Sequence, residues 1–189
     1  MRKLIVHEFI TLDGVIQAPG GVTEDIDGGF AYGGWSRPYW HDDIGAHFGQ
    51  AFSGADSLLL GRKTWQIHGS TFGPHSDQDP FAGMKKYVVS NTLQSVELWP
   101  DSVLIRGNPI DEVRKLKNQP GKNIIMDGSS ALLQSLIEND LVDEYMLHVY
   151  PLVLGMGKRL FPEGKRINLK LIESSTLPTG VVYQRYQPE

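Results

Sequence analysis

Residues 123–151 read NIIMDGSSALLQSLIENDLVDEYMLHVYP, and this stretch decides the fold class. It starts with an apolar run, 123–126, of the kind that forms a strand covered on both faces. Residues 129–139 open on a serine and carry leucines and an isoleucine on one face, which predicts a helix with a serine N-cap. A second apolar run, 143–151, predicts the next strand. Strand, helix and strand in this order predict an α/β domain with a largely parallel sheet.

The same alternation extends along the rest of the chain. We expect further strands at 3–9, 56–60, 85–90, 102–106, 167–174 and 180–186, and further helices at 40–53 and 110–118. Only the turn signal TLPTG, 176–180, separates the last two strands, so they are expected to pair as an antiparallel hairpin at one end of the sheet. Two glycine- and proline-rich stretches, 13–36 and 66–83, show no regular pattern and are predicted to be long loops.

Length and composition restrict the class of protein. A chain of 189 residues with 40% hydrophobic and 21% charged residues predicts a single globular domain over 1–189. The chain has no cysteine, which excludes disulfides and thiolate chemistry and fits a cytoplasmic location. The net charge of −4 argues against nucleic acid as a partner, and no segment has the ~20 apolar residues of a membrane span. The six histidines show no metal-ligand spacing, so no metal site is expected.

Small hydrogen-bonding residues follow three of the predicted strands. They occur in LLLGRKT (58–64), YVVSNTL (87–93) and IIMDGSSALL (124–133). In an open α/β sheet, ligands bind at the carboxyl ends of strands, where backbone N–H groups of the next turn are unpaired. Taken alone, GRKT fits a solvated basic turn equally well. Three such turns together predict a dinucleotide site, although the G-x-G-x-x-G fingerprint is absent.

With these motifs, the chain resembles the dihydrofolate reductase-like superfamily, and within it the bacterial proteins related to the reductase domain of riboflavin biosynthesis. The resemblance covers nearly the whole chain and rests on four stretches: TLDGVI (11–16), LLLGRKTW (58–65), KYVVSNTL (86–93) and GSSALLQSLIENDLVDEYMLHVYPLVLGMGKRLF (128–161). It implies a mostly parallel central sheet flanked by helices, with a C-terminal antiparallel hairpin. It also implies an NADPH-dependent reductase that transfers a hydride to a small conjugated heterocyclic or carbonyl substrate.

The resemblance further implies which residues hold NADPH. Val15, Ile16 and Gln17 would lie beside the nicotinamide in a glycine-rich lid, and Gly61, Arg62, Lys63 and Thr64 would form a phosphate-binding turn. Ser90 and Asn91 would lie on the adenosine side, with Arg106 as a second phosphate contact. Gly128, Ser129 and Ser130 would hold the pyrophosphate. Two positions depart from the family pattern. Asp127 replaces the first glycine of a Gly-Gly pair, which puts an acid near a polyanion. Asn91 is neutral, so the preference for NADPH over NADH stays open.

Substrate-side positions separate this chain from the two familiar activities of the superfamily. Riboflavin reductases carry a lysine where this chain has His7, so reduction of a riboflavin precursor is not expected. Dihydrofolate reductases carry a carboxylate on their first long helix, and Trp40 stands at that position here. Asp42 and Asp43 follow it and are the candidate proton donors, although helix N-termini also carry Asp for the dipole alone. Trp35 and Trp40 are candidates to wall a flat substrate, with core packing as the alternative.

Two alternatives to a reductase stay open. One is a nucleotide-binding module without catalysis. The other is a dimeric interaction protein in which LVDEYMLHVYPLVLG, 141–155, pairs with its twin. A homodimer is expected for the reductase as well, with the apolar segment 145–154 as its surface. The glycine- and lysine-containing stretch 155–159 fits an anion-binding loop, a subunit contact or a plain surface loop.

Overall fold

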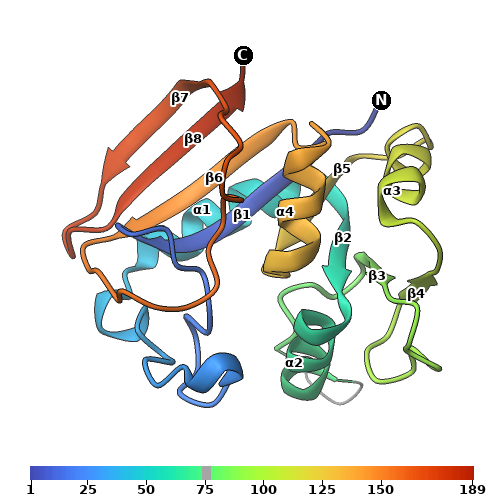
Figure 1. Cartoon of the computed structure of the whole chain (residues 1–189), viewed down its shortest axis with the longest axis horizontal. Helices are drawn as coiled ribbons and strands as arrows, with labels where there is room; N and C mark the ends of the chain where they lie inside the picture. Colours follow the sequence, from blue (N-terminus) through green and yellow to red (C-terminus); the bar gives the residue numbers. More distant parts are fainter. Residues whose placement is uncertain (74–77) are drawn as a thin grey trace.

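The computed structural model describes residues 1–73 and 78–189, and within them eight strands form one sheet (Figure 1). The strands are β1 (Leu4–Thr11), β2 (Ala55–Gly61), β3 (Lys85–Val89), β4 (Ser102–Ile105), β5 (Asn123–Asp127), β6 (Glu144–Tyr150), β7 (Leu169–Thr176) and β8 (Val182–Pro188). Their order across the sheet is β4-β3-β2-β5-β1-β6-β8-β7. All neighbours from β4 to β6 are parallel, whereas β8 pairs antiparallel with β6 and β7. The predicted mostly parallel sheet with a C-terminal hairpin is therefore confirmed.

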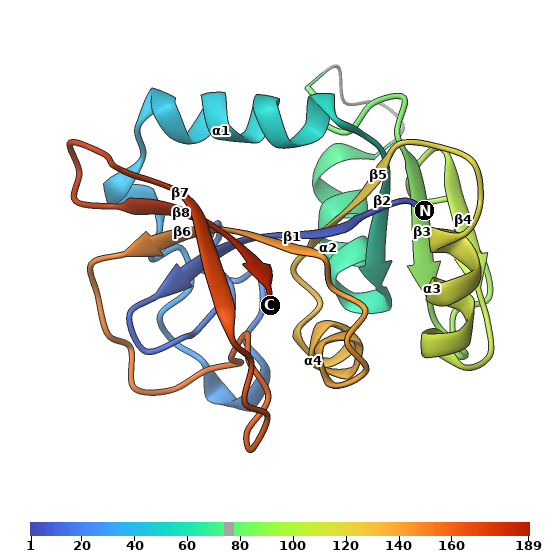
Figure 2. The same cartoon turned by 90° about the horizontal axis from the view of Figure 1, so that it is seen from above.

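Helices cover both faces of the sheet (Figure 2). They are α1 (Asp42–Ser53), α2 (Arg62–Phe72), α3 (Pro109–Lys117) and α4 (Ser130–Glu138), and two short 3₁₀ turns, Asp27–Gly29 and Arg37–Tyr39, lie in the loop after β1. One core cluster packs α1 and α2 against one face, and a second packs α3 and α4 against the other. Alternate residues of each inner strand enter the two clusters, which is why the strands read as continuous apolar runs. No helix in the described ranges is long and apolar enough to cross a membrane.

The prediction of a loop over 66–83 was wrong in its first part, because α2 continues to Phe72. Its apolar stripe is weak in the sequence, since Gly69 occupies the buried position one turn after Trp65. A Cβ at Gly69 would lie only 3.0 Å from the Leu98 side chain, so the close packing of the helix excludes a larger residue. Residues 74–77, which include His75, one of the six histidines, lie outside the described residues.

Two helix starts also differ from the prediction. The helix expected over 40–53 begins at Asp42, with His41 as N-cap, and leaves Trp40 outside it. Ser129 is the N-cap residue of α4, as predicted, but its φ of 68° is left-handed and its side chain caps nothing in that helix. Its Oγ instead accepts a hydrogen bond from the Gly61 N–H of β2, at 2.8 Å. A short-range capping rule could not foresee this contact between two distant turns.

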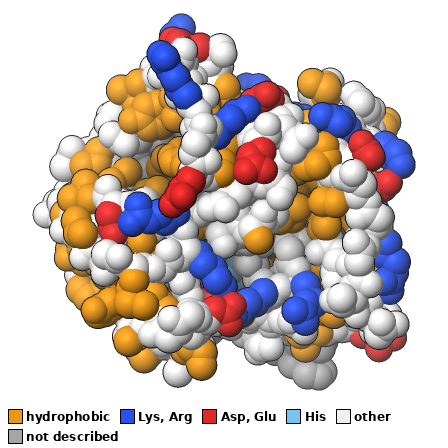
Figure 3. Space-filling view, viewed as in Figure 1, with side chains coloured by type: hydrophobic (Ala, Val, Ile, Leu, Met, Phe, Trp, Pro, Cys, Tyr) orange, Lys and Arg blue, Asp and Glu red, His pale blue; other side chains and the backbone are white. Residues whose placement is uncertain are grey.

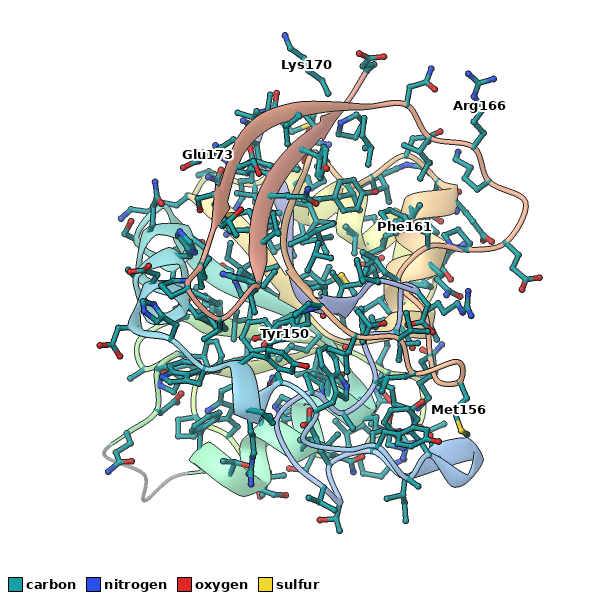
Figure 4. All side chains as sticks on the ribbon, turned by 90° about the vertical axis from the view of Figure 1, so that its left-hand side faces the viewer. Tyr150, Met156, Phe161, Arg166, Lys170 and Glu173 are labelled. Carbon is teal, nitrogen blue, oxygen red and sulfur yellow. The ribbon has the colours of Figure 1, made fainter. Side chains whose placement is uncertain are left out.

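The predicted pairing of the 141–155 strand with its twin is also wrong. β6 lies between β1 and β8, so the hydrogen-bonding groups on both of its edges are already used. Most of its side chains are buried in the two core clusters. The outer strand on this side is β7, from which Lys170 and Glu173 project outward (Figure 4).

Candidate active site

A cavity of about 810 Å³ opens at the carboxyl ends of β1, β2 and β5. This volume lies in the range of small-molecule and cofactor sites, roughly 300–1,000 Å³. Its walls come from the loop after β1, from the starts of α2 and α4, and from aromatic residues of several elements. The predicted site residues that line it are Ile16, Gln17, Gly61, Arg62, Lys63, Thr64, Gly128, Ser129 and Ser130. Two of the three predicted turns, GRKT and DGSS, therefore share one cavity with the predicted lid residues Ile16 and Gln17, whereas Ser90 and Asn91 of the third turn are not among its lining residues.

Two helix N-termini meet in this cavity. Gly61 is the N-cap of α2 and Ser129 the N-cap of α4, and the two residues are joined by the Gly61 N–H to Ser129 Oγ hydrogen bond. First-turn N–H groups have no partner within a helix and carry the positive end of its dipole, so they favour an anion. Gly128 has a φ of +67°, and a Cβ there would lie 3.0 Å from Thr64 Cγ2. The close approach of the two turns thus requires glycine at this position.

The lysine of the first turn is already engaged by carboxylates. Lys63 Nζ lies 2.6 Å from Asp25 Oδ1 and 2.5 Å from Asp27 Oδ2. Lys158 Nζ lies 2.6 Å from the other Asp25 oxygen and 2.8 Å from Asp27 Oδ2, so the stretch 155–159 contacts the loop after β1. Hydrogen bonds from Lys158 and Lys63 lower the pKa of Asp27 to about 2. We call Asp25, Asp27, Lys63 and Lys158 the lid latch, because they tie the glycine-rich loop to α2.

Arg62 is different, because it lines the cavity and forms no ion pair with any described residue. Figure 3 shows basic and acidic side chains side by side low on this face, where Figure 1 places α2 and the loop after β1. Arg62 is exposed in its first helical turn. It is therefore the cation of the predicted phosphate turn that remains available to a ligand.

A carboxylate that was not predicted from the sequence, Glu8, lines the cavity beside the predicted acid Asp127. Glu8 of β1 is 2% exposed, and its Oε1 accepts a hydrogen bond from the Gly128 N–H at 2.6 Å. Burial raises the pKa of Glu8 well above its usual value, and repulsion by Asp127 and Glu24 adds to the effect against the opposing Gly128 hydrogen bond. A glutamate inside the apolar run LIVHEFIT was the available signal, because a strand covered on both faces rarely holds an unpaired acid.

Asp127 and Glu24 are held by neighbouring groups. Asp127 Oδ2 lies 3.2 Å from His68 Nε2, so this carboxylate is directed to α2. Glu24 Oε2 accepts hydrogen bonds from the N–H groups of Gly20 and Gly21, at 2.7 and 2.8 Å. Burial raises the pKa of Glu24, although the two glycine hydrogen bonds oppose the shift. The inner cavity is consequently acidic, and its outer rim at Arg62 is basic.

Aromatic side chains line the same cavity. They are Phe9, Phe48, Phe72 and Phe81. The predicted tryptophans are not among them, as judged from the described lining residues. Trp35 is buried and donates from Nε1 to the Gln17 carbonyl at 2.8 Å, so it supports the lid from behind. Trp40 is 57% exposed.

Other predicted residues lie outside the described lining of the cavity. Asp42 and Asp43 are exposed in the first turn of α1. Val15 is completely buried behind its neighbours Ile16 and Gln17.

A second group sits at the ends of β3 and β4, beside the end of β2. There the Gly107 N–H donates to Asn91 Oδ1 at 2.8 Å, and Arg106 Nη2 donates to the Leu93 carbonyl at 2.7 Å. Ser90 Oγ accepts from the Leu93 N–H at 3.0 Å. Ser90, Asn91 and Arg106 thus form a structured turn on the same edge of the sheet as the cavity.

His7 lies on the opposite face of β1 from Glu8, in an aromatic and histidine cluster. It is fully buried, and its ring centroid lies 5.4 Å from that of His148. Burial lowers the pKa of His7 to about 4 and that of His148 to about 2. His47 Nδ1 lies 3.2 Å from His148 Nε2, yet no three such ligands converge on one point in the described part of the chain. His7 is thus a neutral core residue, unlike the lysine expected of a riboflavin reductase.

Comparisons with known proteins agree with this architecture. The family model described as RibD C-terminal domain matches residues 2–183. Uncharacterized protein YyaP of Bacillus subtilis (strain 168) is 34% identical over 189 residues, which cover 96% of this chain and 92% of that protein. A putative riboflavin biosynthesis protein from Shewanella sp. PV-4 has a similar structure, with a TM-score of 0.77 at 23% identity over 99% of both chains.

Dihydrofolate reductase from Enterococcus faecalis, solved in complex with NADP(H) and RAB-propyl, also shares the fold. Its TM-score is 0.64 at 14% identity, over 99% of this chain and 96% of that one. The predicted dihydrofolate reductase-like α/β fold is thereby confirmed.

Proposed function

The chain belongs to the RibD C-terminal domain family, and from this premise we propose that it is an NADPH-dependent reductase. It transfers a hydride to a small conjugated heterocyclic or carbonyl substrate. The observation that carries the proposal is the meeting of the α2 and α4 N-termini in one cavity, joined by the Gly61 to Ser129 hydrogen bond. The presence of NADP(H) in a dihydrofolate reductase of the same fold supports this choice of cofactor.

The residues of the cavity fit a dinucleotide. The first turns of α2 and α4 offer unpaired N–H groups to two phosphates, and Arg62 adds a free cation. Ile16 and Gln17 would border the nicotinamide, which supplies the hydride when bound. The turn that holds Ser90, Asn91 and Arg106 would take the adenosine side, since β3 is next to β2 in the sheet. Lys63 becomes available to a phosphate when it releases Asp25 and Asp27.

The inner cavity suits a flat, conjugated substrate. Phe9, Phe48 and Phe81 offer aromatic surface, which stacks on planar rings. The acidic groups of the same cavity offer hydrogen-bond acceptors and, from Glu8, a proton. This combination favours a heterocycle that carries N–H groups over an aliphatic ketone. An anionic substrate is disfavoured in the inner cavity by the charges of Asp127 and Glu24.

The test is a titration of the protein with NADPH and, in parallel, with NADH by isothermal calorimetry. We expect NADPH to bind, and lack of binding at millimolar concentration would refute the proposal. Oxidation of NADPH is then followed at its absorbance maximum against a panel of pterins and flavin precursors. Binding without oxidation of NADPH across a broad panel would favour the non-catalytic nucleotide-binding module.

A further inference from the structure

Glu8 has an unusual environment for a carboxyl group. It lies in the centre of the sheet, between the completely buried Val6 and the buried Ile10 on the same face of β1. Removing a charged carboxylate from water costs several kcal/mol unless it is paired with a cation or protonated. No lysine, arginine or histidine of the described chain lies within ion-pair distance of it. Structural stability alone does not account for an acid at this position.

The two oxygens of Glu8 differ. Oε1 accepts the Gly128 N–H at 2.6 Å, which fixes the direction of the carboxyl group. Oε2 has no hydrogen-bond partner in residues 1–73 and 78–189, and Glu8 is one of the residues that line the cavity. Oε2 is therefore the atom left to meet a ligand.

The charged groups that act most strongly on Glu8 favour its protonated form. Asp127 faces it from β5 and Glu24 from the lid, and both are acidic. His68 of α2 is directed to Asp127 rather than to Glu8. The hydrogen bond from the Gly128 N–H acts in the opposite direction, because it lowers the pKa of Glu8 and stabilises the carboxylate that is left after proton transfer.

Groups farther out do not change this balance. On its own strand, the neighbouring His7 points to the opposite face and is neutral. From β6, Glu8 is paired with the apolar Leu147. The lysines at the rim are held by the lid latch, and the cavity arginines Arg37 and Arg62 form no ion pair with Glu8.

We propose that Glu8 is the proton donor of the reduction, delivering a proton from Oε2 to the substrate nitrogen or oxygen whose double-bonded carbon receives the hydride. This rests on the proposed function. The hydride adds to the carbon of a C=N or C=O bond, the π electrons move to the heteroatom, and that atom takes the Glu8 proton. One reduced nicotinamide and one proton are consumed per substrate. The Glu8 carboxylate, held by the Gly128 N–H, is then reprotonated from water.

The proposal replaces the predicted donors. Asp42 and Asp43 are exposed at the start of α1, whereas Glu8 is inside the cavity next to the Gly128 turn. A general acid must reach its acceptor directly or through one water, so location in the cavity decides between them.

The first test needs no cofactor. Infrared difference spectra of wild type and Glu8→Gln at pH 7 are compared in the region of the protonated carboxyl C=O stretch. We expect a band from wild type that is missing in Glu8→Gln and unchanged in the surface control Glu163→Gln. Absence of this band in wild type would overturn the proposal. Glu8→Asp, which keeps an acid at the site, serves as the second variant if Glu8→Gln does not fold.

The second test separates this proposal from the function on which it rests. With the pterin or flavin precursor that wild type reduces, Glu8→Gln should lower kcat about 10²-fold or more while NADPH affinity stays within about threefold. The fall of wild-type kcat at high pH should vanish in Glu8→Gln. A wild type that binds no NADPH would refute the proposed function itself. A Glu8→Gln enzyme with wild-type kcat and pH profile would refute only the role of Glu8.

Discussion

Arg62 lines the cavity in the first turn of α2 and forms no ion pair with a described carboxylate, and a phosphate bound at the start of α2 would lie within its reach. A charge-assisted hydrogen bond of this kind contributes about 1.5–3 kcal/mol, so Arg62→Ala should weaken NADPH binding at least tenfold. Arg166→Ala, an exposed arginine away from the cavity, is the matched control. Calorimetric titration of both variants measures the effect. Equal NADPH affinities for the two variants would contradict a phosphate contact at Arg62.

His7 makes the fold sensitive to acid. Its pKa is about 4 in the folded protein against an ordinary value of 6.5, so the unfolded chain takes up the proton first as the pH falls. Neutral His7 therefore makes its full contribution to the free energy of unfolding above pH 6.5. This contribution is lost as the pH falls toward 4, by up to about 3 kcal/mol. His7→Leu should reduce this loss, as measured by urea unfolding at pH 7 and pH 4.5. The same loss in wild type and His7→Leu would show that other groups cause the acid sensitivity.

At the scale of elements, the lid latch holds the loop after β1 against α2. Asp25 contacts both latch lysines, and its side chain is mostly buried, so Asp25→Asn removes the central member. Ion pairs of this kind contribute about 0.2–1 kcal/mol each. Amide hydrogen exchange over residues 20–30 should accelerate roughly 5–30-fold, which corresponds to a fall of about 1–2 kcal/mol in the free energy of local opening of this loop. Asp111→Asn, in an exposed ion pair on α3, should leave that exchange unchanged. Unaltered exchange in Asp25→Asn would exclude the latch.

Elements were predictable from the sequence where burial imposes a regular pattern. The unit over 123–151 was correct because both its strands are covered on two faces. The positions of the turns after β2 and β5 were also correct, and the left-handed backbone at Gly128 explains the glycine there. Glu8 was missed because its role depends on a partner 120 residues away, the Gly128 N–H. The same limit applies to the Gly61 to Ser129 hydrogen bond, which spans 68 residues and joins the two turns only after the sheet has formed.

For the whole molecule, the position of β6 determines where a second copy can bind. A homodimer cannot extend the sheet through β6, so we expect it to form through the outer strand β7. Leu171 and Ile172 on β7 are 50% and 42% exposed, and an exposed apolar edge strand favours association. Wild type should sediment as a dimer and Leu171→Lys as a monomer in velocity runs. A dimer that persists in Leu171→Lys would place the interface elsewhere.

The hydrogen bond between Gly61 and Ser129 also has a consequence for the length of the ligand. Since β2 and β5 are neighbours in the sheet, α2 and α4 start about one strand spacing apart, roughly 4.8 Å. This separation is set by the spacing of two paired strands, so the distance between the two helix N-termini is fixed. A ligand with two linked phosphates can engage both helices at once. A monophosphate would engage only one, so under the proposed function the backbone would select ligands by their length.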